Sequence, residues 1–455
     1  EDGLTWTFTM RDGLKWSDGT DLNAKDFEYS FKRMANPDTA APYAETCLGM
    51  IDGFDAAQAG DADALNVKAS DDGKTLTIVL SYPCSYFDKM AAFATMSPVQ
   101  QATVEANGDS WCTSADTFVS NGPYMITEWT PSERIVLTKN PNYVGGWDSS
   151  KIVSDTITLL LLEDSSASFA AYNSGEAVLI KDVPTDEIPS LTKAEDGGDF
   201  YVDTILGTYY VSLNLQHDAF KDAKVRKALS LAIDRDYVAN TIMQGTYSTA
   251  DSIVGPGIVD ENGYFHDNGN APYISADYEA NLAEAKKLLE EAGYPNGEGY
   301  PTIEYSTNDA GYHVPLAEYL QQAWGDLGIT LTINKMEWSS FTPARRAGEY
   351  DVARNGWVMD YNDPSNMLDL FCTSNGNNDG KYSNPEFDAA IDASRVADSA
   401  EHFAQLHKAE DILMEDMGCL PIAYYNEYWL QSSSLKGTWH SPYGYWYLQY
   451  GYIEE

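Results

Sequence analysis

The sequence predicts a mixed α/β fold made of two or three packed domains. Its 455 residues are 43% hydrophobic, which is enough apolar material for more than one core and too much for a disordered chain. In the second half, helical patterns that end at Gly293 and Gly328 are each followed by an apolar strand pattern. This alternation is typical of a parallel or mixed sheet covered by helices.

The first half reads as short strands with few helices. Residues 4–10 alternate apolar and polar side chains, as a half-buried strand does, and residues 24–34 follow a helical pattern. A hairpin is expected around residues 71–73, where the apolar residues of the following strand alternate. Further strand patterns cover 124–129, 134–138, 157–162 and 177–180. We therefore expect α+β character and a sheet between residues 122 and 180.

In the second half, helices and strands alternate after a strand pattern at 209–215. The helical patterns cover 224–243, 278–292, 314–327, 385–396 and 400–416. The strand patterns cover 302–306, 329–334, 351–358 and 420–425.

The charge of the chain excludes several classes of partner. With 28 Lys and Arg against 70 Asp and Glu, the formal net charge is −42, which repels nucleic acids and anionic lipid surfaces. No run approaches the ~20 apolar residues of a membrane-spanning helix. Acidity of this degree is also typical of proteins from high-salt habitats. The 31 Tyr and 11 Trp exceed the needs of a core and suit a hydrated binding surface.

Neither a cofactor nor a metal is predicted. Five Cys are scattered without the spacing of a zinc site, and at most two disulfides could form. Nucleophile elbows, Walker loops and zinc-binding helices are absent from the sequence. His402 and His407 share one helical pattern at a spacing of five, which separates their directions and predicts two surface histidines. A carboxylate pair of a glycoside hydrolase could hide among 70 acids, but nothing selects one, and we do not predict an enzyme.

The scarce arginines single out one segment. Only nine are present, and Arg345, Arg346 and Arg354 fall within ten residues. Asp360 follows just beyond the 351–358 strand, at the end where α/β sheets place their ligands. A cation and an anion at this spacing suit a zwitterion with a chain between its charges. An ordinary surface ion pair explains the same spacing, and Trp357 taken alone reads as a core residue.

This segment resembles the ligand site of the oligopeptide-binding proteins that serve ABC importers. The similarity is carried by the runs at 351–357 and 360–364, and further stretches resemble the same family in family order along the chain. These stretches are Trp6-Thr7-Phe8 with Arg11-Asp12-Gly13, Lys15-Trp16-Ser17-Asp18-Gly19-Thr20, Ser120-Asn121-Gly122-Pro123-Tyr124, Glu133-Arg134-Ile135-Val136-Leu137, Val225-Arg226-Lys227-Ala228-Leu229 and Leu288-Leu289-Glu290-Glu291-Ala292-Gly293-Tyr294.

The resemblance implies a two-lobed clamp of the periplasmic-binding-protein type (class II) with an extra domain. The extra α+β domain is expected at 1–118, with its N-terminal part apparently missing. Lobe I is expected at 119–215 with 427–455, and lobe II, which carries the ligand segment, at 216–426. The crossovers are expected near Ser120 and at 425–427, where Asn121 with Gly122 reads equally well as a hinge or a turn.

The resemblance also implies a function without covalent chemistry. Such proteins hold a short peptide by its backbone and charged ends, accept most side chains, and deliver it to a membrane permease. The chain is therefore expected to be an extracytoplasmic monomer, in the periplasm or on the outer face of the membrane, lipid-anchored or secreted. Asp360 is expected to pair with the peptide ammonium, and the backbone of Gly356, Trp357 and Val358 to supply strand-like hydrogen bonds.

Other family positions assign the rest of the expected site. Arg354, Arg345 and His313 match cations that meet the peptide carboxylate, and Tyr361 and Asn362 belong to the ligand segment. Four aromatic residues match positions that line the cleft or its side-chain pockets, although core packing explains each of them as well. These residues are Trp338, Tyr209, Tyr210 and Tyr425.

The chain departs from the family pattern in two places. Family members carry a further N-terminal segment before the 4–10 strand, including a strand that bonds the ligand. Some relatives have a disulfide at the positions of Gly207 and Val358, so that bridge is not expected here. Related proteins bind nickel complexes, haem or oligosaccharides, and these solutes stay open as alternatives to a peptide.

Overall fold

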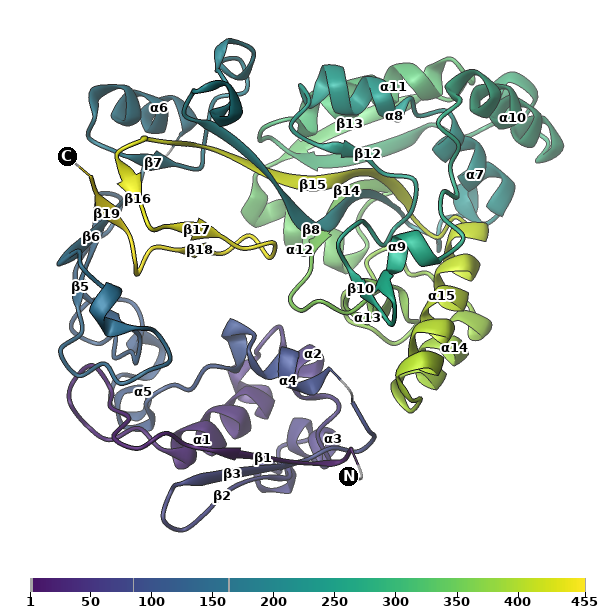
Figure 1. Ribbon diagram of the computed structural model, residues 1–455. Coiled ribbons are helices and arrows are strands. Elements are labelled where there is room, and N and C mark those ends of the chain that lie inside the picture. The colour runs from purple at the N-terminus through teal and green to yellow at the C-terminus, as the bar shows by residue number, and fades with distance from the viewer. Residues whose placement is uncertain (1–2, 85, 163, 455) are drawn as a thin grey trace. The chain divides into compact units, whose positions relative to one another are not determined.

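The computed structural model describes residues 3–84, 86–162 and 164–454, and the chain forms two compact units (Figure 1). Unit 1 consists of Glu1–Asp182, Leu430–Ser441 and Tyr445–Glu455, and unit 2 consists of Val183–Trp429 and Pro442–Gly444. The finer division into three domains stays a prediction.

The beginning of unit 1 follows the expected α+β pattern. Strands β1 (Thr5–Thr9), β3 (Thr75–Val79) and β2 (Val67–Ala69) form an antiparallel sheet in that order. Helix α1 (Ala24–Ala35) contacts this sheet and begins at a capping box formed by Asn23 and Asp26. The shorter helices of this region are α2 (Ala44–Leu48), α3 (Phe54–Gln58), α4 (Phe87–Ala91) and α5 (Gln101–Asn107).

The predicted sheet between residues 122 and 180 is confirmed. It consists of antiparallel strands β4 (Tyr124–Thr130), β5 (Arg134–Lys139) and β6 (Thr156–Leu160), followed by α6 (Ser165–Ser174) and by β7 (Leu179–Ile180), which pairs with residues 430–431. The C-terminal residues add two small ribbons, β16 (Leu435–Lys436) with β19 (Tyr452–Ile453) and β17 (Trp439–His440) with β18 (Trp446–Tyr447).

Unit 2 is organised around a mixed sheet with the strand order β13-β12-β14-β8-β15. Strands β12 (Ile303–Asn308), β13 (Leu331–Met336) and β14 (Val352–Val358) are parallel, whereas β8 (Phe200–Leu213) runs antiparallel to β14. Strand β15 (Leu420–Gln431) continues past the predicted end at residue 425 and pairs with β9 (Ser248–Thr249). The mixed sheet predicted from the sequence is confirmed.

Helices cover this sheet at the predicted positions. Helix α11 (His313–Gly325) contacts β12 and β13, and α14 (Pro385–Arg395) packs against α15 (Ser399–Glu415), as Figure 1 shows. The other helices are α10 (Tyr278–Glu291), α12 (Trp338–Ala347), α13 (Ser365–Leu368) and α9 (Phe265–Asn268), the last of which follows the hairpin β10 (Val259–Asp260) and β11 (Gly263–Tyr264).

The prediction of one helix over 224–243 is wrong. The segment forms α7 (Ala223–Leu231), α8 (Arg235–Tyr237) and a π-turn at Val238–Ile242. The side chain of Asp234 accepts a hydrogen bond from the Tyr237 amide and so begins a new helix. The guanidinium of Arg235 is buried and donates to the carbonyl oxygens of Ser230 and Pro421, which fixes the break.

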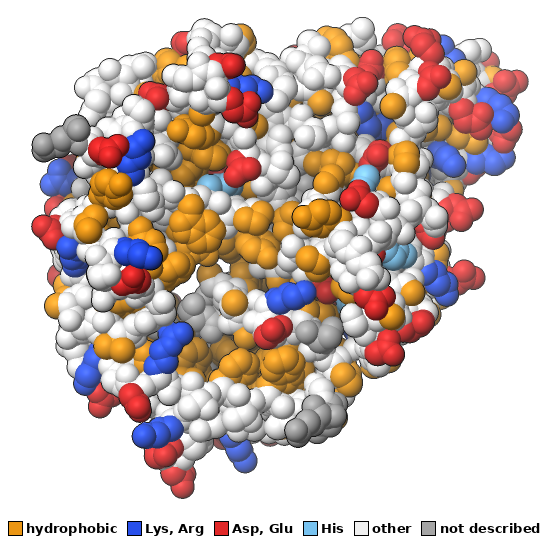
Figure 2. All heavy atoms as spheres, viewed as in Figure 1, with side chains coloured by type: hydrophobic (Ala, Val, Ile, Leu, Met, Phe, Trp, Pro, Cys, Tyr) orange, Lys and Arg blue, Asp and Glu red, His pale blue; other side chains and the backbone are white. Residues whose placement is uncertain are grey.

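Acidic side chains are spread over the face drawn in Figure 2, and the Lys and Arg side chains are scattered among them rather than gathered in a basic patch. Cys112, Cys372 and Cys419 are free thiols. Within the described ranges, no helix has both the length and the apolar character that a bilayer crossing requires. The same residues contain no group of three or more His, Cys, Asp or Glu side chains arranged to bind a metal.

Candidate ligand-binding site

Strand β14 places the predicted ligand segment in the middle of the unit 2 sheet. Its pairing with β8 runs from Val352 to Val358, but its pairing with β12 is registered only at Val352 and Ala353. In the described part of the chain, no strand is registered to residues 354–358 on that second side. This stretch of β14 is therefore a local sheet edge, which can hydrogen-bond an added extended chain.

Arg354 lies in this stretch with its guanidinium surrounded by aromatic rings. Its Cζ atom lies 5.5 Å from the ring centroid of Tyr209 and 5.4 Å from that of Trp338, which is 53% exposed at the start of α12. Its Nη2 atom lies 3.2 Å from Nε2 of His313. No ion pair joins Arg354 to any residue that the structure describes, so its positive charge is uncompensated by an acid.

His313 acts here as an uncharged acceptor. Because a guanidinium can only donate, Nε2 of His313 must accept the bond from Arg354, which leaves Nδ1 to donate to the Tyr209 hydroxyl at 3.2 Å. Burial, together with the nearby charge of Arg354, lowers the pKa of His313 to about 3. The histidine therefore orients Arg354 and adds no second positive charge near neutral pH.

Tyr425 and Tyr209 form an aromatic wall beside Arg354, with ring centroids 6.0 Å apart. Gly356 allows this packing, since a Cβ atom there would lie 2.1 Å from the Tyr425 hydroxyl. The Gly207 and Val358 positions are partners across β8 and β14, and a Cβ atom on Gly207 would also clash with β14.

Tyr210 lies on the opposite face of β8 from Tyr209, because successive side chains of a strand alternate. It packs against Phe371 at 5.7 Å and faces a second charged group, the ion pair between Arg345 Nε and Asp379 Oδ2 at 2.9 Å. The two side chains of that pair are 11% and 6% exposed. The charge of Arg345 is thus neutralised by Asp379 within the protein, whereas that of Arg354 is not.

Asp360 follows β14 and is the counterpart of Arg354. Its carboxylate forms no ion pair with a described residue, and its Oδ2 atom is buried without a hydrogen-bond partner. Burial raises the pKa of Asp360 to about 6, against a lowering hydrogen bond from Asn366. A buried carboxylate without a cation is costly, and a bound ammonium group would remove that cost.

The loop around Asp360 is held by its neighbours. The side-chain oxygen of Asn366 accepts bonds from the Asp360 amide and from Trp357 Nε1, each at 2.9 Å. Tyr361 is buried beneath the loop, and Asn362 bonds the backbone of Gly257 and Val259. Trp357 therefore shares the Asn366 side chain with Asp360, whereas Trp338 lies over the guanidinium of Arg354.

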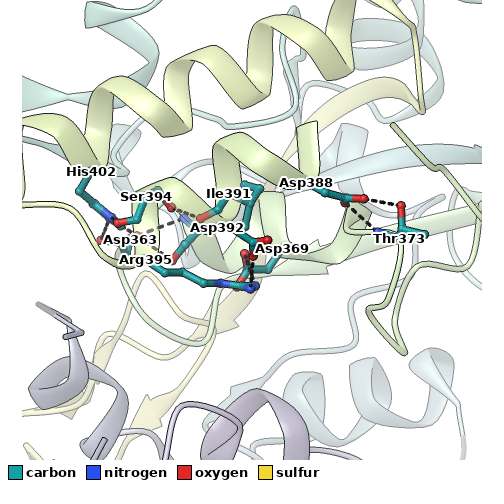
Figure 3. Close-up of polar contacts among 10 residues, drawn as sticks. Asp363, Asp369, Thr373, Asp388, Ile391, Asp392, Ser394, Arg395 and His402 are labelled. Atoms are coloured by element: carbon teal, nitrogen blue, oxygen red, sulfur yellow. Dashed lines mark hydrogen bonds and ion pairs between the residues drawn. The ribbon is translucent and has the colours of Figure 1, made fainter. Parts of the chain in front are cut away.

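The prediction that His402 lies on a surface is wrong. His402 and Asp363 are each 2% exposed, and Nε2 of His402 lies 3.2 Å from both carboxylate oxygens of Asp363 (Figure 3). His407 points elsewhere, as its spacing predicts: it is half-buried, stacks on Phe265 and pairs with Asp260 at 3.1 Å. The helical pattern could not reveal the burial because α14 covers that side of α15.

Sequence reasoning missed Asn366 and Asp379, and it placed Asp363 in the ligand segment without giving it a role. Asn366 comes three residues after Asp363-Pro364 begins a turn, which is the only local signal for it. Asp379 lies in a run of Asn and Gly that reads as a loop. Nothing in such patterns connects an acid to a particular arginine or histidine.

Comparisons with known proteins show the family of the chain. A model described as bacterial extracellular solute-binding proteins, family 5 Middle, matches residues 1–379. The periplasmic oligopeptide-binding protein OppA of Salmonella typhimurium is 36% identical over 433 residues, covering 93% of this chain and 77% of the relative. OppA of Bacillus subtilis is 34% identical over 452 residues, covering 96% and 80%.

A solved structure confirms the fold class. The crystal structure of Haemophilus influenzae OppA in complex with RPPGFSPFR has a TM-score of 0.85 and 31% sequence identity, and covers 99% of this chain and 88% of that chain. The predicted fold, a two-lobed α/β clamp of the solute-binding type, is confirmed by this likeness. The matched family and these relatives are binding proteins by description.

Proposed function

The chain belongs to the bacterial extracellular solute-binding proteins of family 5, and we propose that it is the receptor of an ABC importer that binds short peptides by their backbone and charged ends. One observation carries the proposal: Arg354 has no acid and Asp360 has no cation among the described residues. A peptide with free termini supplies both missing charges.

Asp360 would receive the peptide ammonium. Its buried oxygen without a partner offers an acceptor, and its raised pKa shows that burial disfavours the ionised carboxylate, a cost that a bound cation would offset. Asn366 would hold the Asp360 backbone in place, since its Oδ1 accepts from the Asp360 amide and from Trp357 Nε1.

Arg354 would receive the peptide carboxylate. His313 and the rings of Tyr209 and Trp338 hold its guanidinium without neutralising it. Arg345 would act indirectly, because Asp379 already satisfies its charge and its Nη1 reaches only the carbonyl oxygen of Arg354, at 3.4 Å. The remaining aromatic residue, Tyr425, would line a hydrated side-chain pocket.

The backbone between the two ends would extend β14. Residues 354–358 leave one edge of the strand without a registered partner, and hydrogen bonds to that edge would hold the peptide whatever its side chains are. Because backbone and termini provide the contacts, we expect weak selectivity for peptide sequence and strong selectivity for free termini.

The other expectations belong to the same proposal. The receptor would be an extracytoplasmic monomer that passes its peptide to the transmembrane subunits of an ABC permease, attached to the membrane by a lipid or secreted. The periplasmic relatives and the negative formal charge of −42 support a location outside the cytoplasm and away from anionic lipid and nucleic acid.

Native mass spectrometry of the purified protein, followed by thermal shift with panels of peptides, oligosaccharides, haem and nickel complexes, tests this function. A ligand that binds the folded state raises the melting temperature. We expect co-purified or added peptides of two to several residues to do so, and the other solutes to leave it unchanged. Stabilisation by a sugar, haem or nickel panel with none by peptides would overturn the proposal, and turnover of a bound ligand would reveal an enzyme.

A further inference from the structure

The loop that carries Asp360 rests on helices α14 and α15 through two charge contacts, one buried and one half-buried (Figure 3). His402, on α15, contacts Asp363, and Arg395, at the end of α14, contacts Asp369 Oδ1 at 3.2 Å. Thr373 further along the chain is tied to the same base, since its amide and hydroxyl donate to Asp388 at 3.0 and 2.6 Å. The ligand loop is therefore anchored to α14 and α15 by residues that follow Asp360 in the chain.

The hydrogen bonds of His402 require a charged ring. Nδ1 faces the carbonyl oxygen of Ser394 at 2.9 Å, and Nε2 faces the carboxylate of Asp363, so both nitrogens meet acceptors and both must donate. The amide and the hydroxyl of Ser365 both donate to Oδ1 of Asp363 and so fix the carboxyl group that His402 faces. Burial opposes the charge, but the bonds to Asp363 and Ser394 outweigh it and raise the pKa of His402.

A short chain of hydrogen bonds connects the His402–Asp363 pair to Asp360. The carbonyl oxygen of Asp363 accepts from the Asn366 amide at 3.0 Å, and its carboxylate fixes Ser365 at the start of α13. The side chain of Asn366 then holds the Asp360 amide and Trp357 Nε1. The position of Asp360 thus depends on Asn366, and the position of Asn366 depends on Asp363.

We propose that His402 is a positioning residue for the amine end of the ligand: its charged contact with buried Asp363 holds the loop in which Asn366 presents Asp360. This inference rests on the proposed function. The charge contacts beneath the loop support it: His402 faces Asp363, and Arg395 faces both Asp369 and Asp392, so acids of this network match both cations without Asp360. Asp360 therefore stays available to a ligand cation.

The test is a double-mutant cycle between His402→Gln and Asp360→Asn, read by calorimetric titration with one tripeptide and its N-acetylated form. For the free peptide we expect His402→Gln to weaken binding about tenfold, within the range by which residues behind a site modulate it. The N-acetylated peptide, which lacks the ammonium group, should change less than about twofold. In the Asp360→Asn background, His402→Gln should add almost nothing, because its effect passes through Asp360.

A matched control is His407→Gln, which removes a half-buried His–Asp contact from the same helix, with Asp260 rather than with a residue of 360–369. It should bind both peptides as the wild type does. If His402→Gln does not fold, Asp363→Asn removes the same contact from the loop side and should give the same selective loss.

The outcomes separate this inference from the proposed function. Wild-type protein that binds no peptide would overturn the function. Peptide binding that is sensitive to Asp360→Asn, with additive losses from His402→Gln or equal losses for the free and acetylated peptides, would overturn only the positioning role and leave His402 as a residue of general stability.

Discussion

Arg345 and Arg354 lie nine residues apart, and Nη1 of Arg345 donates to the carbonyl oxygen of Arg354. Nevertheless, an acid neutralises the charge of one arginine and not that of the other. Arg345 is paired with buried Asp379, whereas Arg354 is surrounded by a neutral histidine and aromatic rings. A paired buried charge stabilises the folded state, because removing one partner leaves the other buried without a counter-charge. An unpaired one costs stability, and a bound ligand of opposite charge would offset that cost.

The largest effect should come from breaking the paired arginine. Arg345→Gln leaves Asp379 charged and buried, and we expect the free energy of unfolding to fall by about 3–5 kcal/mol in urea denaturation. The neighbouring Arg346→Gln is a matched control, because Arg346 is exposed and its loss should change stability by less than about 0.5 kcal/mol. Equal small effects at both positions would contradict the structural role of the Arg345–Asp379 pair.

The unpaired acid should behave in the opposite way. The folded protein holds a proton on Asp360 up to about pH 6, whereas an unfolded aspartate releases it near 3.8, so ionisation lowers stability as the pH rises through 6. Asp360→Asn should therefore stabilise the unliganded protein above pH 7 by at most about 3 kcal/mol, and the gain should vanish near pH 4. Denaturation curves at several pH values measure it. A difference that does not vary with pH would show that Asp360 is not desolvated.

Arg354→Gln should affect ligand binding more than stability. We expect it to weaken peptides with a free carboxylate by about 2 kcal/mol or more, because a charged end would be left without its partner. C-terminally amidated peptides should lose little. The control is Arg346→Gln, and a loss of the same size for free and amidated peptides would remove Arg354 from the carboxylate site.

His313 should give the smallest effect. His313→Leu removes the acceptor of Arg354 and should weaken peptide binding by about 1 kcal/mol, whereas His313→Gln keeps an acceptor and should bind nearly as the wild type. With its pKa lowered to about 3, His313 stabilises the fold above about pH 6.5, and this contribution is lost as the pH falls toward 3. Stability that falls less steeply with acidification in His313→Gln would confirm the sign.

The order of strands and helices could largely be predicted from the sequence. The periodicity of apolar residues indicates which face of an element is buried, and glycines mark where helices end. The break at Asp234 was missed, since a cap and a buried arginine act against a continuous helical pattern there. Charge scarcity pointed to Arg345, Arg346 and Arg354 alike. Their three surroundings, paired, exposed and unpaired, depend on contacts with Asp379, solvent and His313 that no local pattern encodes.

The same reason explains the misassigned histidine. With 70 acids in the chain, nothing in the sequence selects Asp363 as the partner of a residue on a distant helix. Pairing between buried charges is a property of the assembled fold, whereas Asp360 was indicated as a ligand residue by its place after a strand and by the family resemblance.

The most direct test of the account is a calorimetric titration of one tripeptide in four forms, with each end free or blocked, into wild type, Asp360→Asn and Arg354→Gln. The account predicts that Asp360→Asn weakens only the forms with a free amine, and Arg354→Gln only those with a free carboxylate. If either variant weakens all four forms equally, the charges of Asp360 and Arg354 do not bind opposite ends of a peptide.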